Sequence, residues 1–124
     1  MDGAATLAGH GLVFDKPNMK ARGEGLPNLQ TSDDASVYGV LFDMSRKQLE
    51  LLEGYFGGYA PTEVSVTPKG AAAKTTATTF IARRRDRKLG PSKASLALCI
   101  QGAEENALPR DFIETLRGLK PYDG

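Results

Sequence analysis

The sequence has little of what several classes of protein require. It contains one cysteine, Cys99, and one histidine, His10, in 124 residues. A single cysteine excludes an internal disulfide framework, and with a single histidine we expect neither a multi-histidine metal site nor a histidine-based triad. We expect His10 to have a minor role in a surface loop. Cys99 has no metal-ligand partner by spacing and falls among apolar residues, so we expect a buried, unreactive thiol.

An excess of charge of one sign is also missing, and so are long apolar runs. Sixteen basic and 15 acidic residues leave a net charge of +1, which gives no electrostatic reason to expect a nucleic acid or membrane partner. No run of about 18 apolar residues and no signal peptide is present. The length and the ordinary composition suit one globular domain, residues 1–124. We therefore expect a single cytoplasmic domain.

The first third of the sequence predicts two strands separated by a long loop. Residues 12–14 favour a short strand, whereas residues 16–34 are rich in Gly, Pro and Asn and predict a loop with at most one short strand. Residues 35–42 are dense in β-forming side chains and predict a central strand. Gly39 within that run indicates a bulge or a close backbone approach.

A short helix is predicted next. Ser45 and Gln48 have the spacing of a capping box, in which each side chain binds a free amide of the first helical turn. Gly54 is expected to end the helix in a left-handed conformation. Glu53 then lies on the last turn.

The remaining sequence predicts a hairpin and two helices. Residues 63–67 and 75–82 alternate as paired antiparallel strands do. Ser92 is expected to cap a helix and Pro109 to open another, which ends before Pro121. Their apolar sides comprise Leu96, Cys99, Ile100 and Ala103 in the first, and Phe112, Ile113, Leu116 and Leu119 in the second. These elements together indicate an α+β domain.

Glu53 is the strongest candidate for chemistry. A carboxylate on the last turn of a helix faces the negative end of the helix dipole, and partial burial would raise its proton affinity toward the range used in acid/base catalysis. The alternative is a solvated glutamate with no function beyond ending the helix.

The order of the motifs resembles that of the gamma-glutamylcyclotransferase-like family, which includes the avirulence-induced-gene-like proteins. The resemblance covers about residues 9–118, and the spacing of the motifs carries it. The matching segments are VYGVLFDM at 37–44, LELLEG at 49–54, GY at 58–59, EVSV at 63–66, PS at 91–92 and GAEENALP at 102–109.

The resemblance implies a small mixed β-barrel with external helices. In the family, a first strand ends in a Tyr-Gly-Ser-Asn loop that holds the γ-glutamyl group, and no such segment occurs in this sequence. Either the segment lies outside the given sequence or the protein has dispensed with it. We expect the resulting sheet edge to be covered by a flanking strand, a lead segment or a partner subunit, which would allow a homodimer.

The family's reaction, as the resemblance implies it, needs neither a cofactor nor a metal. The α-amine of a γ-glutamyl amine or dipeptide attacks its own γ-carbonyl, which forms 5-oxoproline and expels the amine. Glu53 matches the family's proton-transferring carboxylate, and Tyr59 matches a tyrosine that lines the substrate pocket. Ser95 stands where family members often place another pocket tyrosine.

Two further alternatives concern binding. The same fold could serve as a non-catalytic module that binds a small polar ligand or another protein. The basic segment 83–88 could bind phosphate, but its interposed Asp86 favours a solvated turn.

Overall fold

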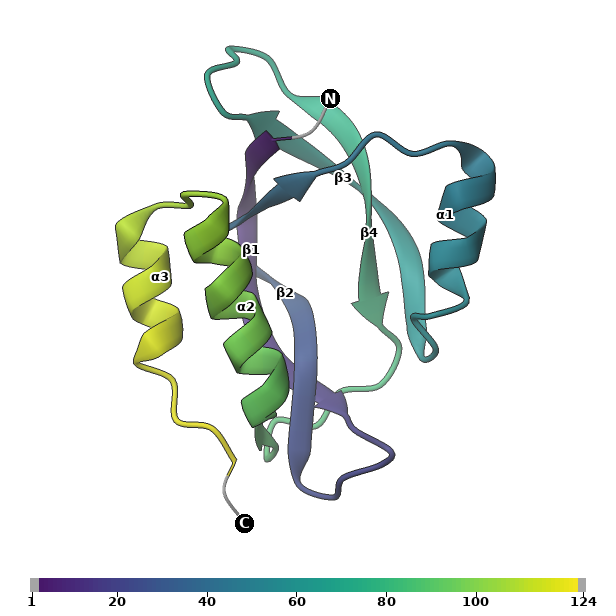
Figure 1. Cartoon of the computed structure of the whole chain (residues 1–124), viewed down its shortest axis with the longest axis vertical. Coiled ribbons are helices and arrows are strands. Elements are labelled where there is room, and N and C mark those ends of the chain that lie inside the picture. Colours follow the sequence, from purple (N-terminus) through teal and green to yellow (C-terminus); the bar gives the residue numbers. More distant parts are fainter. Residues whose placement is uncertain (1–2, 123–124) are drawn as a thin grey trace.

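A computed structural model describes residues 3–122 and shows an α+β architecture with a mixed, curved sheet (Figure 1). Its strands follow the order β4-β3-β1-β2-β5 across the sheet. Three helices accompany the sheet, and α1 lies on the opposite side of the molecule from α2 and α3. The elements are β1 (Gly3–Pro17), β2 (Glu24–Leu41), α1 (Arg46–Glu53), β3 (Tyr59–Pro68), β4 (Thr75–Ala82), β5 (Gly90–Pro91), α2 (Lys93–Glu105) and α3 (Arg110–Arg117).

The long β1–β2 hairpin is the main departure from the sequence prediction. The two strands pair from Gly3↔Leu41 to Pro17↔Gly25, so the predicted loop at 16–34 is wrong for most of its length. Cross-strand partners satisfy the backbone groups of this segment, although its side chains show no clear alternation. Shifts of register occur near Gly9, which has a φ of 76°, and between Val13 and Lys16. The bulge is therefore not at Gly39.

The predicted β3–β4 hairpin is confirmed, with Glu63 opposite Thr78. β3 joins the sheet through a short contact with β1. β5 pairs in parallel with only the first two residues of β2. Residues 36–41 of β2 consequently pair with β1 alone among residues 3–122, and the outer side of β4 is likewise unpaired. This part of β2 is an edge, where the sequence had predicted a central strand.

A capping box stabilises the first turn of helix α1. The Gln48 amide donates to Ser45 Oγ at 3.1 Å and the Ser45 amide donates to Gln48 Oε1 at 2.9 Å, which confirms the capping box. Gly54 has a right-handed φ of −64°, so the predicted left-handed ending is wrong. None of the α1 residues is buried.

Helices α2 and α3, both predicted from the sequence, lie together on one face of the sheet (Figure 1). Ser92 Oγ accepts from the Ser95 amide and caps α2. The rings of Tyr38 and Phe112 meet edge-on at 5.3 Å between centroids, which joins β2 to α3. The buried core consists of Phe14, Leu96, Ala103, Leu108, Ile113 and Leu116. A smaller cluster of Ala5, Leu7 and Val66 lies among the strands.

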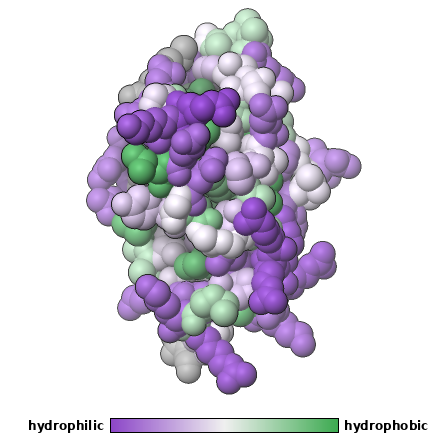
Figure 2. Space-filling model, turned by 90° about the vertical axis from the view of Figure 1, so that its right-hand side faces the viewer, coloured by the Kyte–Doolittle hydropathy of each residue, from purple (hydrophilic) through white to green (hydrophobic). Residues whose placement is uncertain are grey.

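The surface on the α1 side of the molecule is mainly hydrophilic. Hydrophilic side chains cover most of it, with apolar side chains in separate patches between them (Figure 2). Among residues 3–122, no helix is both long enough and apolar enough to cross a membrane.

Candidate functional site

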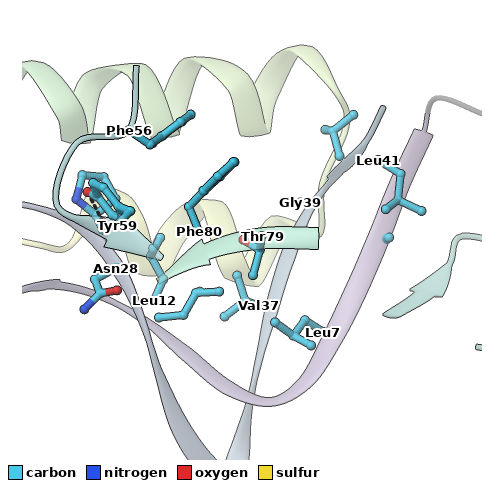
Figure 3. Close-up of a pocket in the computed structure, with 14 residues that line it drawn as sticks. Leu7, Leu12, Asn28, Val37, Gly39, Leu41, Phe56, Tyr59, Thr79 and Phe80 are labelled. Carbon is cyan, nitrogen blue, oxygen red and sulfur yellow. Dashed lines mark hydrogen bonds between the residues drawn. The ribbon is translucent and has the colours of Figure 1, made fainter. Parts of the chain in front are cut away.

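A cavity of about 360 Å³ opens between the strands and the segment that follows α1. We call it the apolar pocket. Leu7 and Leu41 lie toward one end, Phe56, Tyr59 and Asn28 lie toward the other, and Phe80 and Val37 lie between them (Figure 3). Aliphatic and aromatic side chains therefore form most of its wall, and a few polar groups lie at one end.

The aromatic end of the pocket is closely packed. Phe56 stacks on Phe80 with ring centroids 4.5 Å apart, and Phe56 meets Tyr59 edge-on at 5.6 Å. Offset and edge-on contacts of this kind are the preferred arrangements of aromatic rings. They fix Phe56, at the end of the turn after α1, against both strands of the β3–β4 hairpin.

Tyr59 lines the apolar pocket through its ring. Its hydroxyl donates to the carbonyl oxygen of Pro27 at 2.7 Å. Burial raises the pKa of Tyr59 above its ordinary value, and the negative charges of Asp15 and Cys99 contribute in the same direction. The phenol therefore keeps its proton at neutral pH, and that proton is used in a bond to the protein.

A buried polar network supports this end of the pocket. Asn28 Nδ2 donates to Asp15 Oδ1 at 2.7 Å, and Asn28 Oδ1 accepts from the Ala82 amide at 2.8 Å. Arg85 Nη1 donates to the other oxygen of Asp15 at 3.1 Å. The network joins β1, β2 and β4. Sequence reasoning missed it, because Asn28 lies in the segment predicted as a loop.

A second and larger cavity, of about 850 Å³, lies between α1, the end of β2 and β4. We call it the α1 groove. It shares Phe56, Phe80 and three further lining residues with the apolar pocket, so the two cavities adjoin. Leu49 and Leu52 line it from the helix, and Glu63 lines it from β3. Glu63 is a carboxylate that sequence reasoning did not single out.

Glu53 is exposed and lines neither cavity. It follows Leu49 by four residues, which places it on the same side of the helix as this groove-lining residue, and it precedes Phe56 by three residues. Its backbone carbonyl accepts from the Phe56 amide at 3.1 Å. Glu53 thus lies at the rim of the α1 groove. The sequence had allowed partial burial of its side chain, whereas the structure leaves the residue exposed.

The other singled-out residues lie away from both cavities. His10 is in β1, where the sequence predicted a loop, and its ring lies 3.2 Å from the Ala8 carbonyl oxygen. Ser95 is in the first turn of α2. Cys99 is half-buried against the core, and burial raises the pKa of its thiol. No cluster of three or more His, Cys, Asp or Glu that could hold a metal occurs within residues 3–122.

The basic segment 83–88 is more than a solvated turn. Arg85 enters the buried network described above and also donates to the Leu29 carbonyl oxygen. Arg83 Nη1 donates to the Tyr59 carbonyl oxygen at 2.8 Å. These contacts attach the segment to β1, β2 and β3.

Comparisons with known proteins agree on the fold. The model of the AIG2-like family matches residues 36–116. A solved structure of a gamma-glutamyl cyclotransferase is similar with a TM-score of 0.87 and 25% identity, over 98% of this chain and 75% of that chain. The uncharacterized protein loc79017 from Homo sapiens is similar with a TM-score of 0.84 and 26% identity, over 98% and 75% of the two chains. YkqA from Bacillus subtilis shares the fold at 21% identity and a TM-score of 0.78, over 97% of this chain and 45% of that chain. No curated protein matches the sequence.

Proposed function

Because the chain belongs to the AIG2-like family, we propose that it catalyses a gamma-glutamyl cyclotransferase reaction. In this reaction the α-amine of a γ-glutamyl amine or dipeptide forms a bond to its own γ-carbonyl carbon. The γ-carbonyl carbon then loses its bond to the leaving nitrogen, and the products are 5-oxoproline and a free amine. The similar solved structure of a gamma-glutamyl cyclotransferase supports the proposal.

We assign the proton transfers to Glu53. The attacking amine must lose a proton and the leaving nitrogen must gain one, and a single carboxylate can perform both transfers. The observation that carries this assignment is the position of Glu53 one turn before Phe56, which lines both cavities. For catalysis the exposed carboxylate must turn from the rim toward Phe56.

Tyr59 would bind the substrate rather than transfer its proton. Its raised pKa keeps the phenol neutral, and its proton is already donated to Pro27. The hydroxyl oxygen still offers a lone pair to an ammonium or amide donor of the substrate. Backbone amides on the unpaired edge of β2, at 36–41, could stabilise the negative charge that develops on the γ-carbonyl oxygen.

Three substitutions test the role of Glu53. The protein is incubated with a panel of γ-glutamyl amines and dipeptides, and 5-oxoproline is measured by mass spectrometry. We expect Glu53→Gln to lower the rate by about a hundredfold or more. Glu50→Gln, on an exposed residue of the same helix, is the matched control and should leave the rate unchanged. A rate that survives Glu53→Gln but is lost in Glu63→Gln would assign the acid/base role to Glu63 instead.

A second candidate is an interaction module that pairs through its free edges. The unpaired edges of β2 and β4 flank the α1 groove, and Phe42, 63% exposed, and Met44, 45% exposed, line it. Exposed edges and apolar side chains of this kind favour strand addition by a partner. Such a partner could be a second copy of the chain, which would give a homodimer.

Solution mass tests the homodimer. Light scattering after size exclusion should give the mass of two chains, and Phe42→Asp should give the mass of one chain. Leu98→Asp is the control, because Leu98 is 69% exposed and lies on α2, away from the groove. A single-chain mass for the unmodified protein at every concentration would contradict pairing between copies.

A further inference from the structure

A third cavity is formed by basic residues brought together from distant parts of the sequence. It measures about 320 Å³, and its wall includes Lys16 from the end of β1, Arg83 and Arg84 from the segment after β4, and the backbone of Gly57 and Gly58. We call it the basic pocket. The three cations are not recognisable as a group in the sequence, because the fold alone places Lys16 beside the arginines.

The cations of the basic pocket have no carboxylate partners in the part of the chain that the structure describes. Among residues 3–122, no carboxylate oxygen lies within 4.0 Å of the charged nitrogens of Lys16, Arg83 or Arg84. The neighbouring Asp15 pairs with Arg85 and accepts from Asn28 instead. The pocket therefore carries a local excess of positive charge in a nearly neutral protein.

The burial of Lys16 makes this excess of positive charge energetically unfavourable. Its side chain is buried, at 9% exposure, and its ammonium group donates to the Pro17 carbonyl oxygen at 3.2 Å. It also lies 5.3 Å from the centroid of the Tyr59 ring, which gives a cation–π contact. An ammonium group has three protons to donate, and a buried one without a counter-ion is unfavourable. An anion in the pocket would supply the missing charge.

The backbone conformation of Gly58 suits this arrangement. It has a φ of 85°, and a Cβ atom at this position would lie 2.9 Å from Lys16 Cε. A larger residue would therefore force the lysine stem to move. A Cβ at Gly57 would have no atom within 4 Å, so the backbone there is open to a ligand.

We propose that the basic pocket binds the phosphate group of a small, freely soluble phosphorylated molecule. Arginine presents several N–H donors in a planar fork that matches phosphate oxygens, and lysine adds a compact positive charge. The pocket is concave and of a size typical of small-ligand sites. Tyr59 contacts Lys16 and also lines the apolar pocket, so the two sites are neighbours. The proposal does not depend on the cyclotransferase reaction.

Calorimetric titration with pyrophosphate and with inorganic phosphate, at physiological ionic strength where the Debye length is about 8 Å, tests this site. We expect the unmodified protein to bind pyrophosphate, and Arg84→Gln to weaken binding by about tenfold or more, the loss typical of a charged hydrogen bond. Arg84 makes no hydrogen bond or ion pair within residues 3–122, so its replacement should not affect folding. Lys88→Gln removes the same charge from the same segment outside the pocket and should change the affinity by less than about twofold.

Two further measurements distinguish the specific site from general attraction. The amide NMR signals of Gly57 and Gly58 should shift on addition of pyrophosphate, and in Arg84→Gln the same shifts should require a pyrophosphate concentration about tenfold higher or more. Equal losses in Arg84→Gln and Lys88→Gln, or no binding by the unmodified protein, would overturn the proposal. Binding to vesicles of phosphatidylglycerol without binding of free pyrophosphate would also overturn it, since the ligand would then be a lipid headgroup.

Discussion

Replacing Asn28 by alanine removes the centre of the buried network beside the apolar pocket. The side chain is 2% exposed and makes two hydrogen bonds, to Asp15 on one strand and from the Ala82 amide on another. Asn28→Ala would leave the Ala82 amide without its acceptor and would leave one oxygen of Asp15 without its donor. Both groups would stay away from water.

The expected loss follows from these two bonds. A buried polar group that loses its partner costs about 1–3 kcal/mol. Asp15 keeps its bond from Arg85, so its cost should lie at the lower end of that range. We therefore expect Asn28→Ala to lower the free energy of unfolding by about 2–4 kcal/mol. Equilibrium unfolding in urea, followed by circular dichroism, would measure this.

Asn18→Ala is the matched control. Asn18 also makes two side-chain hydrogen bonds, to Glu24 and from the Lys20 amide, but it lies in a turn where water can replace them. Its loss should stay below about 1 kcal/mol. Equal losses for the two alanine variants would refute the reasoning that burial makes the Asn28 bonds important.

The stability of the Asn28→Asp variant should depend on pH. The new carboxylate would face Asp15 at hydrogen-bond distance, and two carboxylates so close raise the pKa of one of them above its unfolded value. A raised pKa in the folded state stabilises at low pH, and this stabilisation is lost as the pH rises through the folded-state pKa. The variant should therefore be more destabilised, relative to the unmodified protein, at pH 8 than at pH 4.

Three other measurements test packing and burial. Tyr59 has a raised pKa, so the folded state holds the phenol proton more tightly than the unfolded state does, and the free energy of unfolding should fall as the pH rises above about 10. Tyr59→Phe should make this fall shallower. An identical slope in the variant would contradict the raised pKa of Tyr59. Cys99, whose thiol pKa burial raises, should react with iodoacetamide at pH 8 more slowly in the folded protein than in urea, and equal rates would show that the thiol is accessible. Leu116 is 2% exposed in the core, so Leu116→Ala should cost about 2–5 kcal/mol in urea unfolding, whereas Leu98→Ala, on the exposed side of α2, should cost under about 1 kcal/mol.

Local signals in the sequence predicted the helices well. The capping residues Ser45 and Ser92 and the apolar spacing of α2 and α3 act over a few residues, so they can be recognised without knowledge of the fold. The β3–β4 hairpin was predicted for the same reason. The family and the α+β class followed from the order of these elements, and both are confirmed.

The errors concern contacts between distant residues. Residues 24–34 became part of a strand because β1 pairs with β2, and residues 36–41 became an edge because no strand among residues 3–122 lies on their other side. The polar network of Asn28 and the basic pocket around Lys16 likewise depend on residues that are dozens of positions apart. A single sequence carries no local signal for such pairings. The positions of Glu53 and Tyr59 were predictable, whereas the direction of the Glu53 side chain was not.

The lack of buried residues in α1 has a consequence for its dynamics. Eight residues are too few to form a stable helix in water by themselves, and here the capping box and the turn before Phe56 are its main support. Amide protons of α1 should therefore exchange with deuterium through local fraying, long before those of α2, whose opening requires the core to unfold. Glu53 is thus carried by one of the least protected segments of the backbone.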